Sequence, residues 1–244
     1  GPSRMYVGDE RCHFFSVGAG DSIGGPGIMK AFLRRETEDG GSPSLSPIDG
    51  LSVPEFTQRN ARLAKLDEQY VKRCLMLPTM GVGIEPQLRE HPDVLYPSLR
   101  AYNRWVEEDW GYGADGRIYG AALLSLCDLD EALRELDRLL KLGARFVILT
   151  AGPFNGRSPG EPHFDPFWAR INEAGIAVVV HAGDSGYTAH GYARDGFTTD
   201  FGGIPQPIRM LQLERPIEDF LASLVCDRLF DRFPRVRVAS VVTS

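Results

Sequence analysis

The fold is decided by one stretch of sequence, Ile176-Ala177-Val178-Val179-Val180-His181-Ala182-Gly183-Asp184. Its apolar run is too short for a helix and too uniformly apolar for a half-exposed strand, which predicts a buried parallel strand. His181 stands at the C-terminal end of that strand. Catalytic and ligand-binding residues of α/β folds stand at the C-terminal ends of strands, because the strand fixes the side chain while the following loop leaves room for a ligand. His181 is therefore the first candidate functional residue.

Strand-like stretches alternate with helical ones along most of the chain. Five predicted strands cover residues 73–78, 117–126, 144–150, 176–181 and 236–242. Helices are expected between them, and another is expected from Pro54, before the first strand. This alternation implies right-handed βαβ crossovers and a parallel sheet, either open or closed into a barrel.

Several residues predict where the helices start. Asp128 is expected to cap a helix, with Glu131 three residues later returning the hydrogen bond as a capping box. Asp165 followed by Pro166 predicts another capped start, and Pro216 predicts the start of the last helix. Apolar stripes on these helices are expected to face the core, and they include Phe56, Leu63, Leu66, Tyr70, Trp105, Trp110, Ile217, Phe220, Leu224 and Val225.

Composition limits the classes of partner. A formal net charge of -6 and a pI near 5.4 argue against a broad nucleic-acid surface. The scattered cysteines Cys12, Cys74, Cys127 and Cys226 form no Cys-x-x-Cys pair, so neither a disulfide framework nor a zinc ribbon is indicated. No apolar run approaches the roughly 20 residues that span a bilayer, and the N-terminus shows no signal region. We expect a soluble cytoplasmic protein, with no membrane partner, that binds a small molecule.

The first 50 residues differ in composition from the rest. Residues 1–50 are rich in Gly, Pro and Ser and predict loops with a short hairpin around 11–15, whereas residues 51–244 predict the partial (β/α) barrel domain. The last predicted strand stops two residues before the end of the sequence, so we expect a truncated or incompletely represented protein. Uncovered strand edges pair readily with other chains, which predicts a homo-oligomer.

Four stretches resemble a known family, the metal-dependent amidohydrolase superfamily, in the branch similar to aminocarboxymuconate-semialdehyde decarboxylase. They lie within roughly residues 50 to 242, and their order and spacing carry the resemblance more than any one of them does. They are Arg62–Gln69, Asn103–Gly120, Phe164–Trp168 running through to Val180-His181, and Leu221–Leu224 running through to Arg232–Val238.

The resemblance implies an α/β fold of the (β/α)8 TIM-barrel type, represented here by about five strands. It also implies a divalent metal, zinc or manganese, at the C-terminal ends of the strands. His181 matches the metal-ligating histidine of the fifth strand. Residues 1–50 contain no His-x-His or Glu-x-His pair, and the last-strand aspartate of the family has no counterpart.

Each candidate site residue has a functional and a plainer interpretation. His181 is a metal ligand or a hydrogen-bonded histidine at the end of a core strand. Asp184 orients His181 or a water, or it caps its own loop. Arg157, in the loop after the predicted strand 144–150, clamps a substrate carboxylate or lies exposed in solvent. The remaining histidines are expected to be surface, edge or loop residues: His13, His91, His163 and His190.

Two functional hypotheses follow. The first is a metal-dependent hydrolase or non-oxidative decarboxylase acting on a small carboxylated cyclic or aromatic compound, with His181 as the metal ligand. The second is a truncated, non-catalytic barrel fragment that has lost its metal site and is stabilised by self-association.

Overall fold

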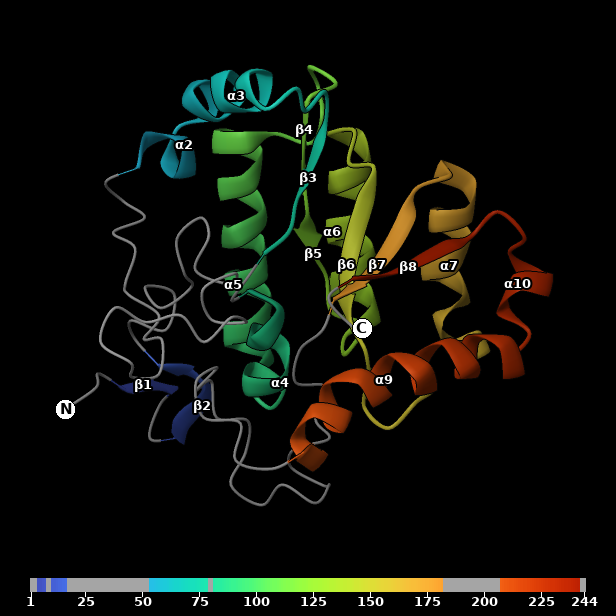
Figure 1. The fold of residues 1–244 in the computed structure, drawn as a ribbon. Helices are drawn as coiled ribbons and strands as arrows, with labels where there is room; N and C mark the ends of the chain where they lie inside the picture. Colours follow the sequence, from blue (N-terminus) through green and yellow to red (C-terminus); the bar gives the residue numbers. More distant parts are fainter. Residues whose placement is uncertain (1–3, 8–9, 17–52, 79–80, 182–206, 242–244) are drawn as a thin grey trace.

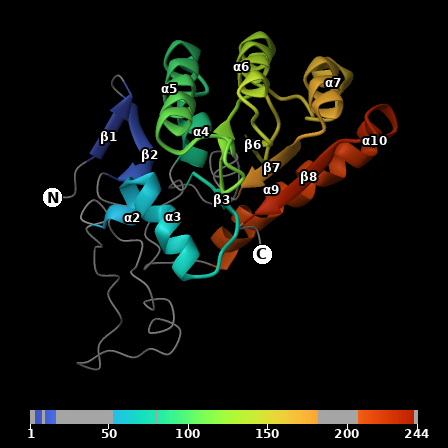
Figure 2. The ribbon, with the colours of Figure 1, turned by 90° about the horizontal axis from the view of Figure 1, so that it is seen from above.

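The computed structural model describes residues 4–7, 10–16, 53–78, 81–181 and 207–241, and of residues 4–16 and 207–214 it describes the backbone only. Parallel strands form the centre, and helices lie along one side of them (Figures 1 and 2). The predicted α/β class with parallel strands is confirmed. Among the described residues, no helix combines the length and the apolar character needed to cross a membrane.

The N-terminal segment contains the predicted hairpin. Its strands β1 (Arg4–Val7) and β2 (Glu10–Ser16) pair antiparallel. The helix expected from Pro54 is two helices, α2 (Pro54–Thr57) and α3 (Arg59–Glu68), because Gln58 between them is extended. Tyr70, expected on the buried stripe, is 96% exposed, since it lies after the end of α3 in a left-handed conformation.

Five predicted strands form the parallel part of the structure. The short strand β3 (Cys74–Met76) pairs with β4 (Ile118–Gly120). The others form a four-stranded parallel sheet in sequence order: β5 (Ala122–Leu123), β6 (Phe146–Thr150), β7 (Ala177–His181) and β8 (Arg237–Val241). β4 and β5 together are the predicted strand 117–126, so one stretch of chain pairs with β3 on one side and with β6 on the other.

A buried asparagine completes the ladder beside β5. The backbone N–H of Leu123 donates to Oδ1 of Asn103 at 2.8 Å, and Nδ2 of Asn103 donates to the Leu123 carbonyl at 3.0 Å. Nδ2 also donates to Oε1 of Glu135 at 2.9 Å. Asn103 therefore replaces a missing strand neighbour, because buried backbone groups require partners.

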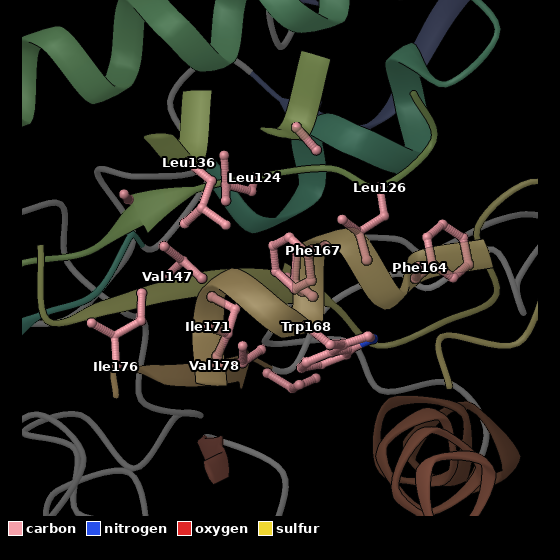
Figure 3. Close-up of a cluster of buried hydrophobic side chains, with 14 of the residues drawn as sticks. Leu124, Leu126, Leu136, Val147, Phe164, Phe167, Trp168, Ile171, Ile176 and Val178 are labelled. Atoms are coloured by element: carbon pink, nitrogen blue, oxygen red, sulfur yellow. The ribbon is translucent and has the colours of Figure 1, made fainter. Parts of the chain in front are cut away.

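The helices that follow the strands are α4 (Ile84–Leu88), α5 (Pro92–Trp105) with a π-helical turn (Val106–Trp110), α6 (Leu129–Lys141), α7 (Asp165–Ala174), α9 (Pro207–Cys226) and α10 (Leu229–Arg232). Helices α5, α6 and α7 form an outer row beside the strands (Figure 2). Alternate strand residues Val147 and Val178 pack against Leu136, Phe167 and other residues of α6 and α7 (Figure 3). Burial of each such side chain contributes about 1.5–3 kcal/mol. This cluster therefore holds α6 and α7 against the strands.

Some predicted starts and burials are corrected by the structure. Asp165 is the first residue of α7 rather than its cap, because the 3-10 turn Pro162–Phe164 leads directly into the helix and leaves the Asp165 backbone helical; its carboxylate pairs with Arg232. Pro216 lies inside α9, which begins at Pro207. Val225 is 63% exposed and Trp105 is 46% exposed, so neither belongs to the core, whereas Trp110 is buried as expected.

Candidate functional site

The C-terminal ends of β5, β6 and β7 bring three polar side chains into a row. Thr150 and His181 are direct Cα partners at the ends of β6 and β7. Leu123 pairs with Ile148, and Ser125 and Thr150 each lie two residues further along. Leu123, Ile148 and Val179 belong to one buried apolar cluster on the inner side of the strands. Side chains alternate along strands, so the residues two positions later, Ser125, Thr150 and His181, face that same side. His181 is half-buried in this row.

A buried carboxylate, that of Glu85 on α4, lies behind this row. The residue is only 3% exposed, and its Oε1 accepts a hydrogen bond from the guanidinium of Arg89 at 3.0 Å. The thiol of Cys127 lies 3.8 Å from the same oxygen. Its second oxygen, Oε2, is buried and meets no donor in good hydrogen-bond geometry among the described residues. Glu85 is thus an incompletely satisfied acid at the strand ends.

Opposing effects act on the pKa of Glu85. Burial raises this pKa above its ordinary value, because desolvation disfavours the charged form. The charge and hydrogen bond of Arg89 and the nearby Ser125 and Thr150 hydroxyls lower this pKa, but burial dominates. Burial and the nearby carboxylate also raise the pKa of the Cys127 thiol to about 11, which keeps the thiol protonated at neutral pH.

Two hydroxyl groups accept backbone hydrogen bonds at the start of α6. The backbone N–H of Asp128 donates to the Tyr96 hydroxyl oxygen, and the backbone N–H of Cys127 donates to the Ser125 hydroxyl oxygen at 3.3 Å. Tyr96 thereby takes the N–H of Asp128 that the predicted capping box assigned to Glu131.

The loop after β6 carries Arg157. Phe154 and Arg157 exchange two backbone hydrogen bonds of 3.0 Å, which closes a tight turn and leaves the Arg157 side chain exposed. Nη1 of Arg157 donates to Glu161 at 3.2 Å. The indole N–H of Trp168 donates to the Pro159 carbonyl at 2.8 Å and so ties the loop to α7. Arg157 therefore stands on an anchored loop with a carboxylate already beside it.

The other predicted residues are placed as follows. Asp184 and His190 lie outside the described residues. His163 is exposed, with its ring edge-on to Phe164. His91 immediately precedes α5, and His13 lies on β2. The described structure therefore brings neither His91 nor His163 into the row with His181.

A divalent metal would find one candidate ligand in the described part of the chain, His181. Within the described ranges, no group of three or more His, Cys, Asp or Glu side chains is placed to hold an ion. An open catalytic zinc site takes three protein ligands, so the described residues do not complete such a site.

A larger hollow lies at the opposite end of the strands. It has a volume of about 590 Å³ and is lined at the strand starts by Arg73, Arg145 and Arg237, with apolar side chains between them. In barrels of this kind the chemistry belongs to the C-terminal ends and the N-terminal face serves stability. We therefore assign the site to the row at His181 rather than to this hollow.

The sequence interpretation did not single out Glu85, although two signals pointed to it. Glu85 follows the first predicted strand of the barrel domain, and loops after parallel strands meet at one edge of the sheet. Arg89 stands four residues after Glu85, the spacing of an ion pair on one helical face. That the carboxylate is buried depends on how α4 packs, which no local pattern encodes.

Comparisons with known proteins agree with this fold. The model of a family described as amidohydrolase matches residues 53–240. The crystal structure of an amidohydrolase from Mycobacterium avium subsp. paratuberculosis K-10 is 34% identical, with a TM-score of 0.82 over 100% of this chain and 65% of that one. No curated protein gives a significant match to the sequence.

Two more distant structures share the fold. The 2,6-dihydroxybenzoate decarboxylase from Rhizobium is 19% identical, with a TM-score of 0.55 over 91% of this chain and 61% of that one. A dihydroxybenzoic acid decarboxylase from Polaromonas sp. JS666, with bound manganese and the inhibitor 2-nitroresorcinol, is 17% identical, with a TM-score of 0.53 over 88% and 60%. The chain thus spans less than two thirds of the length of each of these structures.

Proposed function

Because the chain belongs to the amidohydrolase family and forms part of its TIM barrel, we propose that it acts as an amidohydrolase-type enzyme, either a hydrolase or a non-oxidative decarboxylase. The observation that carries this proposal is the position of His181 at the C-terminal end of β7, in a row with Ser125 and Thr150. In (β/α) barrels that end of the strands is where catalytic residues stand.

The proposed substrates are small carboxylated cyclic or aromatic compounds. Support comes from the names of two structures that share the fold, decarboxylases of 2,6-dihydroxybenzoate and of dihydroxybenzoic acid. Arg157 is proposed to bind the substrate carboxylate, since a guanidinium matches a carboxylate in a bidentate geometry. Its Nη1 donates to Glu161 at 3.2 Å, so a substrate carboxylate would compete with Glu161 for the guanidinium.

A divalent metal, manganese or zinc, belongs to this proposal, with His181 as one ligand and Asp184 as the residue that orients His181 or a water. The Polaromonas structure contains manganese, which supports a metal for the family. His181 is the one candidate ligand among the described residues, so metal binding is the property to be tested first.

The test uses the full chain loaded with Mn²⁺ or Zn²⁺, with bound metal measured by mass spectrometry and substrates surveyed for release of carbon dioxide or for hydrolysis. We expect bound metal and turnover in the wild type and loss of both in His181→Ala. His163→Ala is the matched control, because His163 is exposed and lies outside the row. A folded wild type that binds no metal would favour the non-catalytic alternative.

The predicted homo-oligomer and cytoplasmic location belong to the same proposal. Among the described strands β8 has one neighbour, β7, and the backbone of such an edge can pair with a second chain. Light scattering over a range of protein concentrations tests for the oligomer, and a monomer at every concentration would contradict it.

A further inference from the structure

Asn155 and Gly156 form the tip of a tight hairpin in the loop after β6. Phe154 and Arg157, on either side of them, exchange two backbone hydrogen bonds of 3.0 Å. Between these bonds φ is 49° at Asn155 and 75° at Gly156. Positive φ at both central residues of a two-residue loop defines a type I′ turn, for which Asn-Gly is a favoured sequence. The turn is therefore encoded locally, and Arg157 is the first residue after it.

The base of this hairpin is fixed in the core, whereas its tip is exposed. Phe154 is 1% exposed, and its ring meets that of Phe164 edge-on at a centroid distance of 5.8 Å. Further along the loop, the Trp168 indole N–H donates to the Pro159 carbonyl at 2.8 Å. Residues 155–157 between these anchors are exposed. Apolar packing therefore holds the two ends of the segment and leaves its tip to be held by polar contacts.

The Asn155 side chain supplies such a contact. Its Nδ2 donates to the carbonyl of Cys127, in the loop after β5, at 2.6 Å. The backbone N–H of Cys127 in turn donates to the Ser125 hydroxyl at 3.3 Å. Ser125 belongs to the row at the strand ends that includes His181. A chain of hydrogen bonds thus joins the tip of the hairpin to this row, and Asn155 makes the link between the two loops.

The Arg157 guanidinium keeps donors for a ligand. Its Nη1 donates to Oε2 of Glu161 at 3.2 Å, and the backbone N–H of Ser158 holds Oε1 of the same carboxylate at 2.9 Å. Nε and Nη2 of Arg157 meet no hydrogen-bond acceptor among the described residues. A guanidinium binds a carboxylate through two parallel hydrogen bonds. The position of this open edge depends on the backbone at Arg157, and hence on the turn before it.

We propose that Asn155 is a positioning residue for carboxylate binding by Arg157. Its left-handed conformation shapes the turn, and its amide ties the turn to the loop after β5. The inference deepens the proposed function, because it rests on Arg157 as the residue that binds a carboxylate. Alanine disfavours the left-handed conformation and lacks the amide, whereas glycine accepts the conformation and lacks only the amide.

The first measurement is the NMR signal of the Arg157 Nε–H group in the intact, metal-free chain, assigned by its loss in Arg157→Gln. We expect Asn155→Ala to shift this signal by more than a line width and Asn155→Gly to shift it by less. Asn60→Ala, at an exposed position of α3, is the matched control and should leave the signal in place. Circular dichroism establishes that each variant is folded. An unmoved Arg157 signal in folded Asn155→Ala would overturn the proposal.

The second measurement is the affinity of the full chain, with Mn²⁺ present, for benzoate, a simple aromatic carboxylate, by isothermal titration calorimetry. Loss of a hydrogen bond to a charged group weakens affinity by about tenfold or more, so we expect this loss in Arg157→Gln. Asn155→Ala should bind benzoate less tightly than wild type, and Asn60→Ala should bind it equally tightly.

The outcomes separate the inference from the proposed function. Weakened binding in Arg157→Gln together with wild-type affinity in Asn155→Ala would refute the positioning role of Asn155 alone. A wild type that binds no benzoate, or an Arg157→Gln variant that binds it as tightly as wild type, would refute carboxylate binding by Arg157. The NMR signal would in that case still report whether Asn155 fixes the Arg157 side chain.

Discussion

Among single residues, Glu85 makes the stability of this protein depend on pH in a specific way. Burial raises its pKa in the folded state above its ordinary value of 4.5, so the folded protein binds a proton more readily than the unfolded chain does. The favourable contribution of the neutral acid is fully present below pH 4.5 and is lost as the pH rises through the raised pKa.

Glu85→Gln cannot titrate, so wild-type stability should fall relative to this variant as the pH rises above 4.5. Urea unfolding of both proteins over a series of pH values measures the difference. Glu90→Gln controls for the general effect of removing a carboxylate. A difference between wild type and Glu85→Gln that stays constant with pH would show that Glu85 is not desolvated in the folded protein.

Asn103 is a second residue whose removal should change the free energy of unfolding. Asn103→Ala leaves the N–H and the carbonyl of Leu123 buried without their partners. Each unsatisfied buried group costs about 1–3 kcal/mol, so we expect the free energy of unfolding to fall by roughly 2–4 kcal/mol.

The control for this prediction is Asn60→Ala, at an exposed position of α3. An exposed substitution of this kind should change the free energy of unfolding by no more than about 0.5 kcal/mol. Equal stability of Asn103→Ala and Asn60→Ala in urea would mean that Asn103 does not substitute for a strand neighbour.

At the scale of elements, the start of α6 shows how far local sequence signals reach. The side chain of Asp128 accepts a hydrogen bond from the Glu131 N–H at 3.0 Å, as the sequence predicts. The reciprocal bond does not form, because the Glu131 carboxylate pairs with Arg100 and Arg134 instead. An N-cap depends on neighbouring residues and can be predicted from the sequence. The ion pair between Glu131 and Arg100 of α5 depends on how the two helices pack, and the sequence does not show it.

Removal of this cap gives a prediction for α6. Asp128→Ala should lower the free energy of unfolding by about 1 kcal/mol, the usual loss for an N-cap side chain. Asp128→Asn keeps an acceptor and should retain most of the stability. Chemical denaturation of the two variants checks this, and equal losses would indicate that the charge of Asp128, rather than its hydrogen bond, stabilises α6.

Two predictions about helices were wrong: the start of α9 at Pro216 and the burial of Trp105. Pro216 fits the first turn of a helix, and the sequence could not reveal that α9 begins nine residues earlier, at Pro207. Trp105 lies beside the buried stripe of α5 and leans on Tyr102 at a ring distance of 5.8 Å, but remains 46% exposed. Periodicity gives the direction of a stripe, whereas its width depends on the neighbouring elements.

For the whole molecule, the order of strands and the position of His181 were predictable, because buried apolar runs and their alternation with helices are encoded locally. The exposure of β8 was not predictable. The apolar run at residues 236–242 predicts a buried strand, yet Arg237, Ala239 and Ser240 are exposed. Burial of a strand depends on what packs on both faces, and this information lies outside the strand.

His181, at the C-terminal end of β7, is proposed to be a metal ligand. The most direct measurement is pulsed electron paramagnetic resonance of the Mn²⁺-loaded full chain, which detects magnetic coupling between the metal and a histidine nitrogen. If His181 binds the metal, the wild type shows a nitrogen coupling that is lost in His181→Ala and kept in His163→Ala. The same coupling in wild type and His181→Ala would contradict it.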